Sequence, residues 1–291
     1  MNSIGRSHLF LVLATSILLR VLSAHAETNN SKLRILTEDW PPISYEENGK
    51  AQGMAVELVQ AIQKDVGNQD AIEVVPWARG YKLLQDSPNT VLFTLIRNPE
   101  REKMFALLGP VARGNISLFV LQKSAKSFSN LTEIKNNATI AATRGTAFQT
   151  TLLQQGFHNV VDVLNTEMGL RLLLSGRVDI LCDDSLTIAD LLKKLQISGA
   201  HLKTAAVLQD YNLYLGFSPG TDVNSILQWK KSLEKIKHNG RYASIYRKWF
   251  TDMRPPKNVE LIGLVPEELR NLDKPITKRL VVEHHKDASH N

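Results

Sequence analysis

The chain contains one cysteine, Cys182, among 291 residues. A single cysteine excludes a disulfide within the chain, whatever compartment the protein occupies. Cys182 lies in a short apolar run, which favours a small buried side chain over a reactive thiol. No cysteine stands directly after the N-terminal leader described below, so a lipid anchor on a mature N-terminal cysteine is not expected either.

The sequence also lacks long runs of one charge and clusters of metal-binding residues. Its formal net charge of +6 is spread along the chain, and no basic run or RNA-binding motif favours a nucleic-acid partner. There is no Gly-x-Ser-x-Gly elbow and no pairing of cysteine with histidine. The sequence therefore gives no support to nucleophilic catalysis, and no cofactor or metal is expected.

Residues 1–26 have the pattern of a cleaved signal peptide. Arg6 supplies the positive start, residues 9–19 are an apolar run, and Ala24-His25-Ala26 is an A-x-A cleavage site. The alternative, an uncleaved membrane anchor, would need a longer apolar run of about 20 residues. We therefore expect cleavage after Ala26 and a soluble protein outside the cytoplasm, most naturally in a Gram-negative periplasm.

After the leader, short apolar runs alternate with amphipathic helical patterns, as in α/β proteins. Strands are predicted over residues 33–36, 72–75, 91–95, 116–122, 139–142, 160–163, 178–182 and 211–217. Helices are predicted over residues 54–66, 147–155, 166–174, 186–195, 225–238 and 241–250. Two α/β units follow from this order, with the second one starting near residue 139.

The C-terminal segment differs from what precedes it, because Pro255-Pro256 breaks the last helix and mixed charges follow. A short helix is predicted over residues 261–272. The nearby histidines His284, His285 and His290 fit a mobile polar tail better than a metal site. We expect this tail to be dispensable for any binding function.

An arginine sits at an unusual place in the stretch that follows the strand at 91–95. Asn98 can cap a helix, and Pro99 and Glu100 suit its first turn. Arg101 does not suit it, because a cation there faces the positive end of the helix dipole. Arg97 adds a second cation. Both arginines could be solvated surface charges, but together they also suit a site for a carboxylate or a phosphate.

Seven segments, taken in order, carry a family resemblance: residues 34–42 (RILTEDWPP), 53–62 (GMAVELVQAI), 77–84, 98–105 with Gly109-Pro110, 142–146 (ATRGT), 176–184 (GRVDILCDD) and 239–250 (NGRYASIYRKWF). Over about residues 32–250 the chain resembles the family 3 extracellular solute-binding proteins, the periplasmic receptors of polar amino-acid ABC transporters. The resemblance implies an α/β type II periplasmic-binding-protein fold, in which two lobes, each a mixed sheet flanked by helices, are joined by two crossover strands. The implied boundaries are 27–120 with 208–254 for lobe 1, 121–207 for lobe 2 and 255–291 for a C-terminal extension.

The resemblance also implies roles for individual residues. Arg101 matches the arginine that holds the ligand carboxylate, and Gly145-Thr146 matches a second carboxylate contact, where a helix N-terminus can hold an anion. Asp184 matches the residue that binds the ligand ammonium group, with Asp183 one position away as the alternative. Either aspartate could instead cap the following helix. Trp40 matches an aromatic cover over the ligand, and Trp77 is a weaker candidate for a second wall.

Several residues depart from the family pattern around the expected site. Where similar receptors often carry small hydroxyl residues, this chain has Phe93, Thr94, Leu95 and Ile96, so that only Thr94 keeps a hydroxyl. Arg97 and Arg144 add positive charge. These departures favour a ligand with additional negative charge, or one with an apolar part that faces Phe93 and Phe148. The candidate binding residues are Trp40, Trp77, Thr94, Arg97, Arg101, Arg144, Thr146 and Asp184.

Three functions fit the resemblance. The first is capture of a small polar or anionic solute, an amino acid or related carboxylate, by a monomeric receptor that delivers it to an inner-membrane ABC permease. The second is a cyclohexadienyl dehydratase-like enzyme, for which Glu38, Asp39 or Asp184 would be the acid; the sequence gives it little support. The third is a secreted ligand sensor that would signal through a separate membrane protein.

Overall fold

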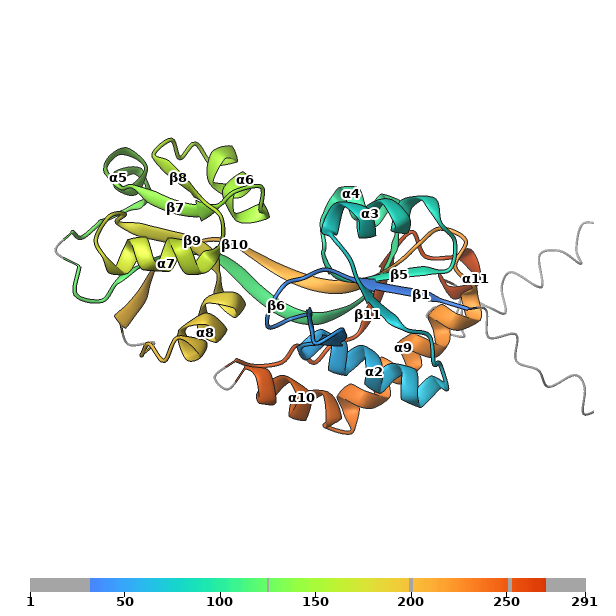
Figure 1. Cartoon of the computed structure of the whole chain (residues 1–291). Coiled ribbons are helices and arrows are strands. Elements are labelled where there is room, and N and C mark those ends of the chain that lie inside the picture. Colours follow the sequence, from blue (N-terminus) through green and yellow to red (C-terminus); the bar gives the residue numbers. More distant parts are fainter. Residues whose placement is uncertain (1–31, 125, 199–200, 251–252, 271–291) are drawn as a thin grey trace, which may run out of the picture. The chain divides into compact units, whose positions relative to one another are not determined.

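The computed structural model describes residues 32–124, 126–198, 201–250 and 253–270 (Figure 1). The leader with its cleavage site and the three histidines of the tail lie outside these residues. Among the helices of the described part, none has the length and apolar character needed to cross a membrane. The described residues from Leu33 to Arg270 belong to one unit.

One mixed sheet of nine strands organises the described part of the chain. Its order is β4-β1-β5-β10-β6-β9-β7-β8, and β11 pairs with β6 beside this path. The strands are β1 (Arg34–Thr37), β4 (Ile72–Val74), β5 (Thr90–Ile96), β6 (Ala106–Leu121), β7 (Ile140–Thr143), β8 (Val160–Val163), β9 (Ile180–Asp184), β10 (Leu202–Phe217) and β11 (Glu260–Gly263). A separate hairpin joins β2 (Tyr45–Glu47) to β3 (Lys50–Gln52).

Two long antiparallel strands, β6 and β10, link the two ends of the sheet (Figure 1). Each has 16 residues, and they pair from Ala106 opposite Phe217 to Leu121 opposite Leu202. β5 and β11 flank one end of this ribbon, and β9 flanks the other. The sequence predicts only 116–122 and 211–217 as strands, so both are longer than expected.

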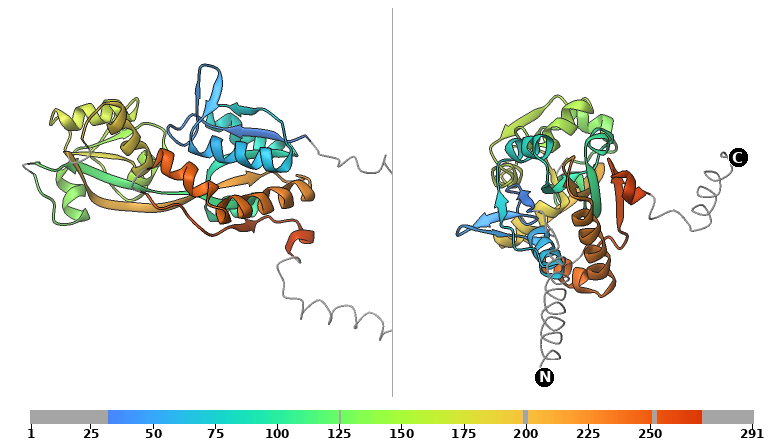
Figure 2. Two further views of the ribbon diagram at one scale, coloured as in Figure 1. Left: turned by 90° about the horizontal axis from the view of Figure 1, so that it is seen from below. Right: turned by 90° about the vertical axis from the view of Figure 1, so that its right-hand side faces the viewer.

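Helices cover both faces of the sheet. They are α2 (Met54–Val66), α3 (Trp77–Asp86), α4 (Pro99–Met104), α5 (Leu131–Asn137), α6 (Ala147–Gln154), α7 (Thr166–Leu174), α8 (Ser185–Lys194), α9 (Val223–His238), α10 (Arg241–Trp249) and α11 (Glu267–Arg270). Near β1 and β5, helices α2, α9 and α10 pack together on one side (blue and orange in the left view of Figure 2), and α3 packs on the other.

Alternation along the strands builds these two faces, because successive side chains of a strand point in opposite directions. Ile35 joins the apolar cluster with α2 and α9, while its neighbour Leu36 joins the cluster with α3. Around β7 and β9, Leu181 packs with the α7 residues Leu170 and Leu173. The predicted helices at 54–66 and 166–174 have the bounds seen in the structure, whereas α3, α5 and the hairpin have no counterpart among the predicted elements.

The C-terminal segment is the main correction to the predicted fold. The helix expected over 261–272 is wrong for its first residues, because Leu261 and Ile262 lie in β11 and pair with β6. The two side chains point to opposite faces of the sheet, as successive residues of a strand do: Leu261 packs toward one apolar cluster and Ile262 toward another. Beyond the strand, Val265 and Leu269 are 7% and 5% exposed. The described part of the segment therefore contributes to the core, and whether it is dispensable for binding stays a prediction.

Candidate functional site

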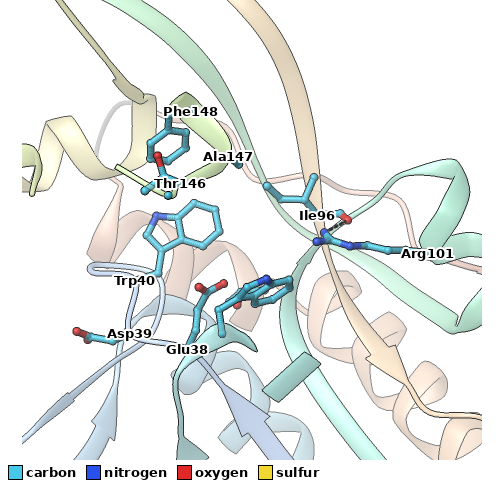
Figure 3. A pocket seen from close by; sticks show the side chains of 11 residues that line it. Glu38, Asp39, Trp40, Ile96, Arg101, Thr146, Ala147 and Phe148 are labelled. Carbon is cyan, nitrogen blue, oxygen red and sulfur yellow. Dashed lines mark hydrogen bonds between the residues drawn. The ribbon is translucent and has the colours of Figure 1, made fainter. Parts of the chain in front are cut away.

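A cavity of about 290 Å³ lies off the carboxyl ends of β1, β5 and β7 (Figure 3). The carboxyl ends of parallel strands are where open α/β sheets place their ligands, because the loops that follow these strands converge there. β1 runs parallel to β5, and β7 runs parallel to β9. The cavity is lined by Glu38, Asp39, Trp40, Trp77, Thr94, Ile96, Arg101, Gly145, Thr146, Ala147 and Phe148.

Arg101 reaches the cavity because of the way α4 begins. Asn98 caps this helix, and its side chain accepts a hydrogen bond of 2.8 Å from the backbone N–H of Arg101. The guanidinium donates to the carbonyl of Ile96 at 2.6 Å and lies over the rings of Trp77 and Tyr81, 5.0 and 5.4 Å from their centroids. It forms no ion pair within the described residues. A half-buried guanidinium supported on aromatic faces keeps donors for an incoming anion.

Burial lowers the pKa of Arg101, and Tyr81 and Glu38 oppose that change. An arginine stays protonated even so, because its pKa starts far above neutrality. The charge of Arg101 is therefore present in the cavity at any pH of interest. It is screened less than a surface charge would be.

Thr94 faces the cavity through an irregularity of β5. Between the pairs Leu95–Tyr214 and Leu92–Gly216, two residues of β5 stand opposite the single residue Leu215. This is a β-bulge, and Thr94 within it has a φ of 71°. A β-branched residue rarely occupies this left-handed region, and such strain is concentrated at functional sites. The bulge re-aims the end of the strand toward the cavity.

Glu38 brings a carboxylate into the same cavity, directly after β1. Figure 3 shows its carboxylate pointing into the group of labelled side chains, while that of Asp39 points away. Burial raises the pKa of Glu38 to about 7, the positive charge of Arg101 opposes the rise, and the negative charge of Asp39 adds to it. An ionised carboxylate at this position is costly unless a cation accompanies it.

The start of α6 forms the opposite wall. Thr146 caps the helix: its hydroxyl donates to the carbonyl of Thr143 at 2.7 Å and accepts from the backbone of Gln149 at 3.4 Å. Ala147 and Phe148 also line the cavity. Their backbone N–H groups belong to the first helical turn, where no intrahelical acceptor exists. This wall can offer backbone donors and the positive end of a helix dipole to an anion.

Trp40 closes another side of the cavity and is held by residues from later in the chain. Its indole Nε1 donates to the hydroxyl of Thr187 on α8 at 3.0 Å, and its ring lies 6.1 Å from that of Tyr211 on β10. Thr187 in turn donates to Asp184 at 3.2 Å. The indole is therefore oriented by a hydrogen-bond chain that ends at a buried carboxylate.

Asp184 lies outside the cavity. It is fully buried and caps α8, accepting from the backbone of Leu186 at 3.1 Å and of Thr187 at 3.0 Å, and it also accepts the hydroxyl of Tyr211. Burial raises its pKa to about 6, and the bond from Tyr211 opposes the rise. Asp183 is also fully buried and accepts from Thr166 at 2.7 Å. Both carboxylates are fully buried and line no part of the cavity, so neither is placed to meet an ammonium group there.

Two other candidates also stay outside the cavity. Arg97 donates to Glu102 at 2.6 Å and to Glu260 at 3.4 Å, which takes it toward the C-terminal segment. Arg144 is exposed. Phe93 is fully buried in the core with α2, so it offers no wall to a ligand. The structure thus brings together five of the eight candidates: Trp40, Trp77, Thr94, Arg101 and Thr146.

Sequence reasoning missed the binding potential of Glu38 and treated it only as a catalytic alternative. The position of Glu38 was the signal that could have revealed this role. Glu38 directly follows β1, which runs parallel to β5, so Glu38 and Ile96 lie at the same edge of the sheet. Tyr81, which supports Arg101, was also missed because α3 was not predicted. Cys182 is buried as expected, and burial raises the pKa of its thiol.

Comparison with known proteins gives the family. The model of bacterial extracellular solute-binding proteins, family 3, matches residues 33–252. The chain belongs to this family. Among curated proteins, this family member is similar to the putative ABC transporter arginine-binding protein 2 of Escherichia coli (strain K12), with 27% identity over 235 residues, 75% of this chain and 90% of the relative.

Solved structures show the same fold. The arginine-, lysine-, histidine-binding protein ArtJ from Geobacillus stearothermophilus has a TM-score of 0.60 at 20% identity, covering 78% of this chain and 97% of ArtJ. A histidine kinase sensor domain with similarity to periplasmic binding proteins has a TM-score of 0.64 at 19% identity, and the match covers 77% of this chain and 99% of that domain. These likenesses confirm the expected α/β periplasmic-binding-protein fold of this solute-binding protein.

Proposed function

We propose that this solute-binding protein captures a small amino acid whose carboxylate binds Arg101 and whose cationic group binds Glu38. The observation that carries the proposal is the presence of a guanidinium group and a carboxyl group, each partly buried, in one cavity of about 290 Å³. A cavity of this size lies near the lower end of the range for small-molecule sites. A ligand with both signs of charge neutralises the site without leaving a buried charge unpaired.

The carboxylate end would lie between Arg101 and the start of α6. The guanidinium can bind a carboxylate through two parallel hydrogen bonds, and the N–H groups of Ala147 and Phe148 can add neutral donors. Trp40 and Trp77 would cover the apolar part of the ligand. Removal of Arg101 would leave the carboxylate in the cavity without a charged partner, which costs about 2–5 kcal/mol.

The cationic end distinguishes this proposal from the sequence-based expectation of a more negative ligand. That expectation depended on Arg97 and Arg144, which line no part of the cavity. Glu38 is there instead. Because Asp184 is engaged with α8 and Tyr211, Glu38 supports the proposal as the acceptor for an ammonium or guanidinium group.

The family and the pattern of the leader support a proposal for the cellular role. We propose a monomeric periplasmic receptor, exported with cleavage after Ala26, that hands its amino acid to an inner-membrane ABC permease and catalyses no reaction. We also propose the lobe boundaries of 27–120 with 208–254, and 121–207. β6 and β10 support these boundaries, because they are the strands that continue from one end of the sheet to the other.

The experiment has two parts. Mass spectrometry of the small molecule released on denaturing the purified protein identifies any retained ligand, and thermal shift with the twenty amino acids ranks those that bind. A saturating amino acid at 100 times its dissociation constant should add about 2.7 kcal/mol of stability. Arg101→Ala is the matched control and should lose the shift. Binding of uncharged sugars or of dicarboxylates in preference to all amino acids would contradict the proposal.

A further inference from the structure

The segment from Asn258 to Leu269, here called the C-terminal strap, lies beyond residues 33–252 that match the family. We propose that this strap fixes helix α4 and thereby holds Arg101 in position for ligand binding. The strap includes β11, which pairs with β6 at residues 106–109, and it ends on the buried side chain of Leu269. The effect on α4 is independent of the proposed function, whereas the effect on ligand affinity rests on it.

Two contacts anchor the strap to the rest of the protein before it reaches α4. The ammonium group of Lys237 donates to the carbonyl of Asn258 and to that of Pro110 on β6, both at 2.7 Å. Glu260 then accepts the hydroxyl of Tyr214 on β10. The strap is therefore tied to three elements of the core, namely α9, β6 and β10.

The strap meets α4 at the end of β11. The N–H of Leu264 donates to the carbonyl of Phe105, directly after α4, at 2.9 Å. Gly263 has a φ of +83°, and a Cβ added there would lie 2.4 Å from the carbonyl oxygen of Phe105 and 2.9 Å from that of Glu102. Only glycine allows so close an approach of two backbones. The register of the strap against the helix is thus set by its backbone.

Arg97 joins the strap to the helix from the other side. It donates to Glu260 on the strap at 3.4 Å and to Glu102 on α4 at 2.6 Å. Arg97 was a candidate ligand contact in the sequence. In the structure its guanidinium instead pairs with two carboxylates, those of Glu102 and Glu260. A network of charges that joins two elements contributes more to stability than isolated ion pairs on the surface do.

Helix α4 needs such support. It has six residues, Pro99–Met104, none of which is buried. A helix of this length is not stable by itself, because the hydrogen bonds of one or two turns do not offset the cost of nucleation. Its position therefore comes from its cap, from the packing of Arg101 on Trp77 and Tyr81, and from the strap. Loss of the strap would loosen the helix that carries the carboxylate-binding arginine.

Hydrogen exchange in the ligand-free, full mature chain tests the first step. In Gly263→Val, amides of residues 97–105 should exchange at least tenfold faster, while those of α2 should keep their rates and so exclude global unfolding. Glu260→Gln, a milder change, should act in the same direction if Gly263→Val does not fold. Lys257→Ala, an exposed position before the strand, is the matched control. Unchanged exchange in α4 would overturn the proposal.

Affinity for an amino acid tests the second step. The probe is L-arginine, or the amino acid with the largest thermal shift if L-arginine gives none. Glu260→Gln should weaken binding at least tenfold in the wild-type background and have little further effect in Arg101→Lys, which still binds measurably; a merely structural role would not predict this difference. Faster exchange in α4 with unchanged affinity would overturn the proposal. If no amino acid binds the wild type, the proposed function fails, and the exchange result alone decides whether the strap holds the helix.

Discussion

Proton release on ligand binding offers a direct test of Glu38. In the ligand-free protein, burial raises the pKa of this carboxyl group from 4.5 to about 7. Because the folded state then holds a proton that the unfolded chain has lost, the stability of the ligand-free protein should fall as the pH rises from 4.5 through 7. A cationic ligand has the opposite preference, since it binds the ionised form. Its affinity should therefore increase over the same range.

The magnitude follows from the two pKa values. Ionising Glu38 in the empty cavity costs at most about 3 kcal/mol more than in water, an upper limit because the side chain keeps some exposure. If a bound cation returns the pKa of Glu38 to 4.5, affinity should fall by up to about 150-fold between pH 8 and pH 4.5, because half of the bound form is itself protonated at pH 4.5. At pH 6, about nine-tenths of the ligand-free protein carries the proton, so binding should release about 0.9 proton, and at pH 8 about 0.1.

Calorimetry in two buffers with different ionisation enthalpies counts these protons. The wild type should release close to one proton at pH 6, and Asp39→Asn should release slightly fewer, because the negative charge of Asp39 adds only a minor part of the rise in the pKa of Glu38. Glu38→Gln should bind its best amino acid more weakly at pH 8 and should release no proton at either pH. Binding by the wild type at pH 6 without proton release would refute the assignment of Glu38 as the cation acceptor.

Three further changes test other parts of the structure. Arg101→Lys should weaken binding at least tenfold in calorimetry while the thermal midpoint of the ligand-free protein stays within a few degrees, because an ammonium group cannot form the two parallel bonds of the guanidinium; unchanged affinity would contradict the carboxylate site. Asp184→Asn should lower the free energy of unfolding, measured by urea denaturation of the ligand-free protein, by about 1–3 kcal/mol, because Asp184 caps α8 and accepts from Tyr211. A loss of affinity for amines without a loss of stability would instead identify Asp184 as an ammonium ligand. Leu269→Ala should cost about 2–5 kcal/mol in the same assay, since this strap residue is buried, and no effect would mean that the tail is dispensable after all.

Local patterns were enough to predict much of the fold. The helix at 54–66 has a continuous apolar side and ends at Gly67, whose φ of 73° is the left-handed conformation in which glycine commonly ends a helix. The missed hairpin had a signal of its own, because Asn48 and Gly49 have φ values of 52° and 71° and form the kind of turn that this pair favours. The length of β6 was underestimated because Gly109, Pro110 and Gly114 interrupt its apolar pattern.

The site was harder to predict, because it depends on contacts between distant parts of the chain. Arg97 and Arg101 are both candidates in the sequence, yet Arg97 pairs with Glu260, 163 residues later, whereas Arg101 packs on the ring of Trp77. Asp184 has the right spacing for a ligand contact, but Tyr211, 27 residues later, occupies it. Glu38 becomes part of the site only because β1 lies beside β5 in the sheet. None of these relations is encoded in a short sequence window.

The pairing of β6 with β10 also determines the order in which the chain can be assembled during synthesis. Strands β7, β8 and β9 and helices α5 to α8 all lie between these two strands in sequence, so they form one contiguous segment. By contrast, β5 pairs with β10 across about 120 residues and β11 pairs with β6 across about 150, and such distant contacts form slowly. The wall that holds Thr146 can therefore form while the chain is still emerging. The wall that holds Arg101 is completed only when the last strand arrives.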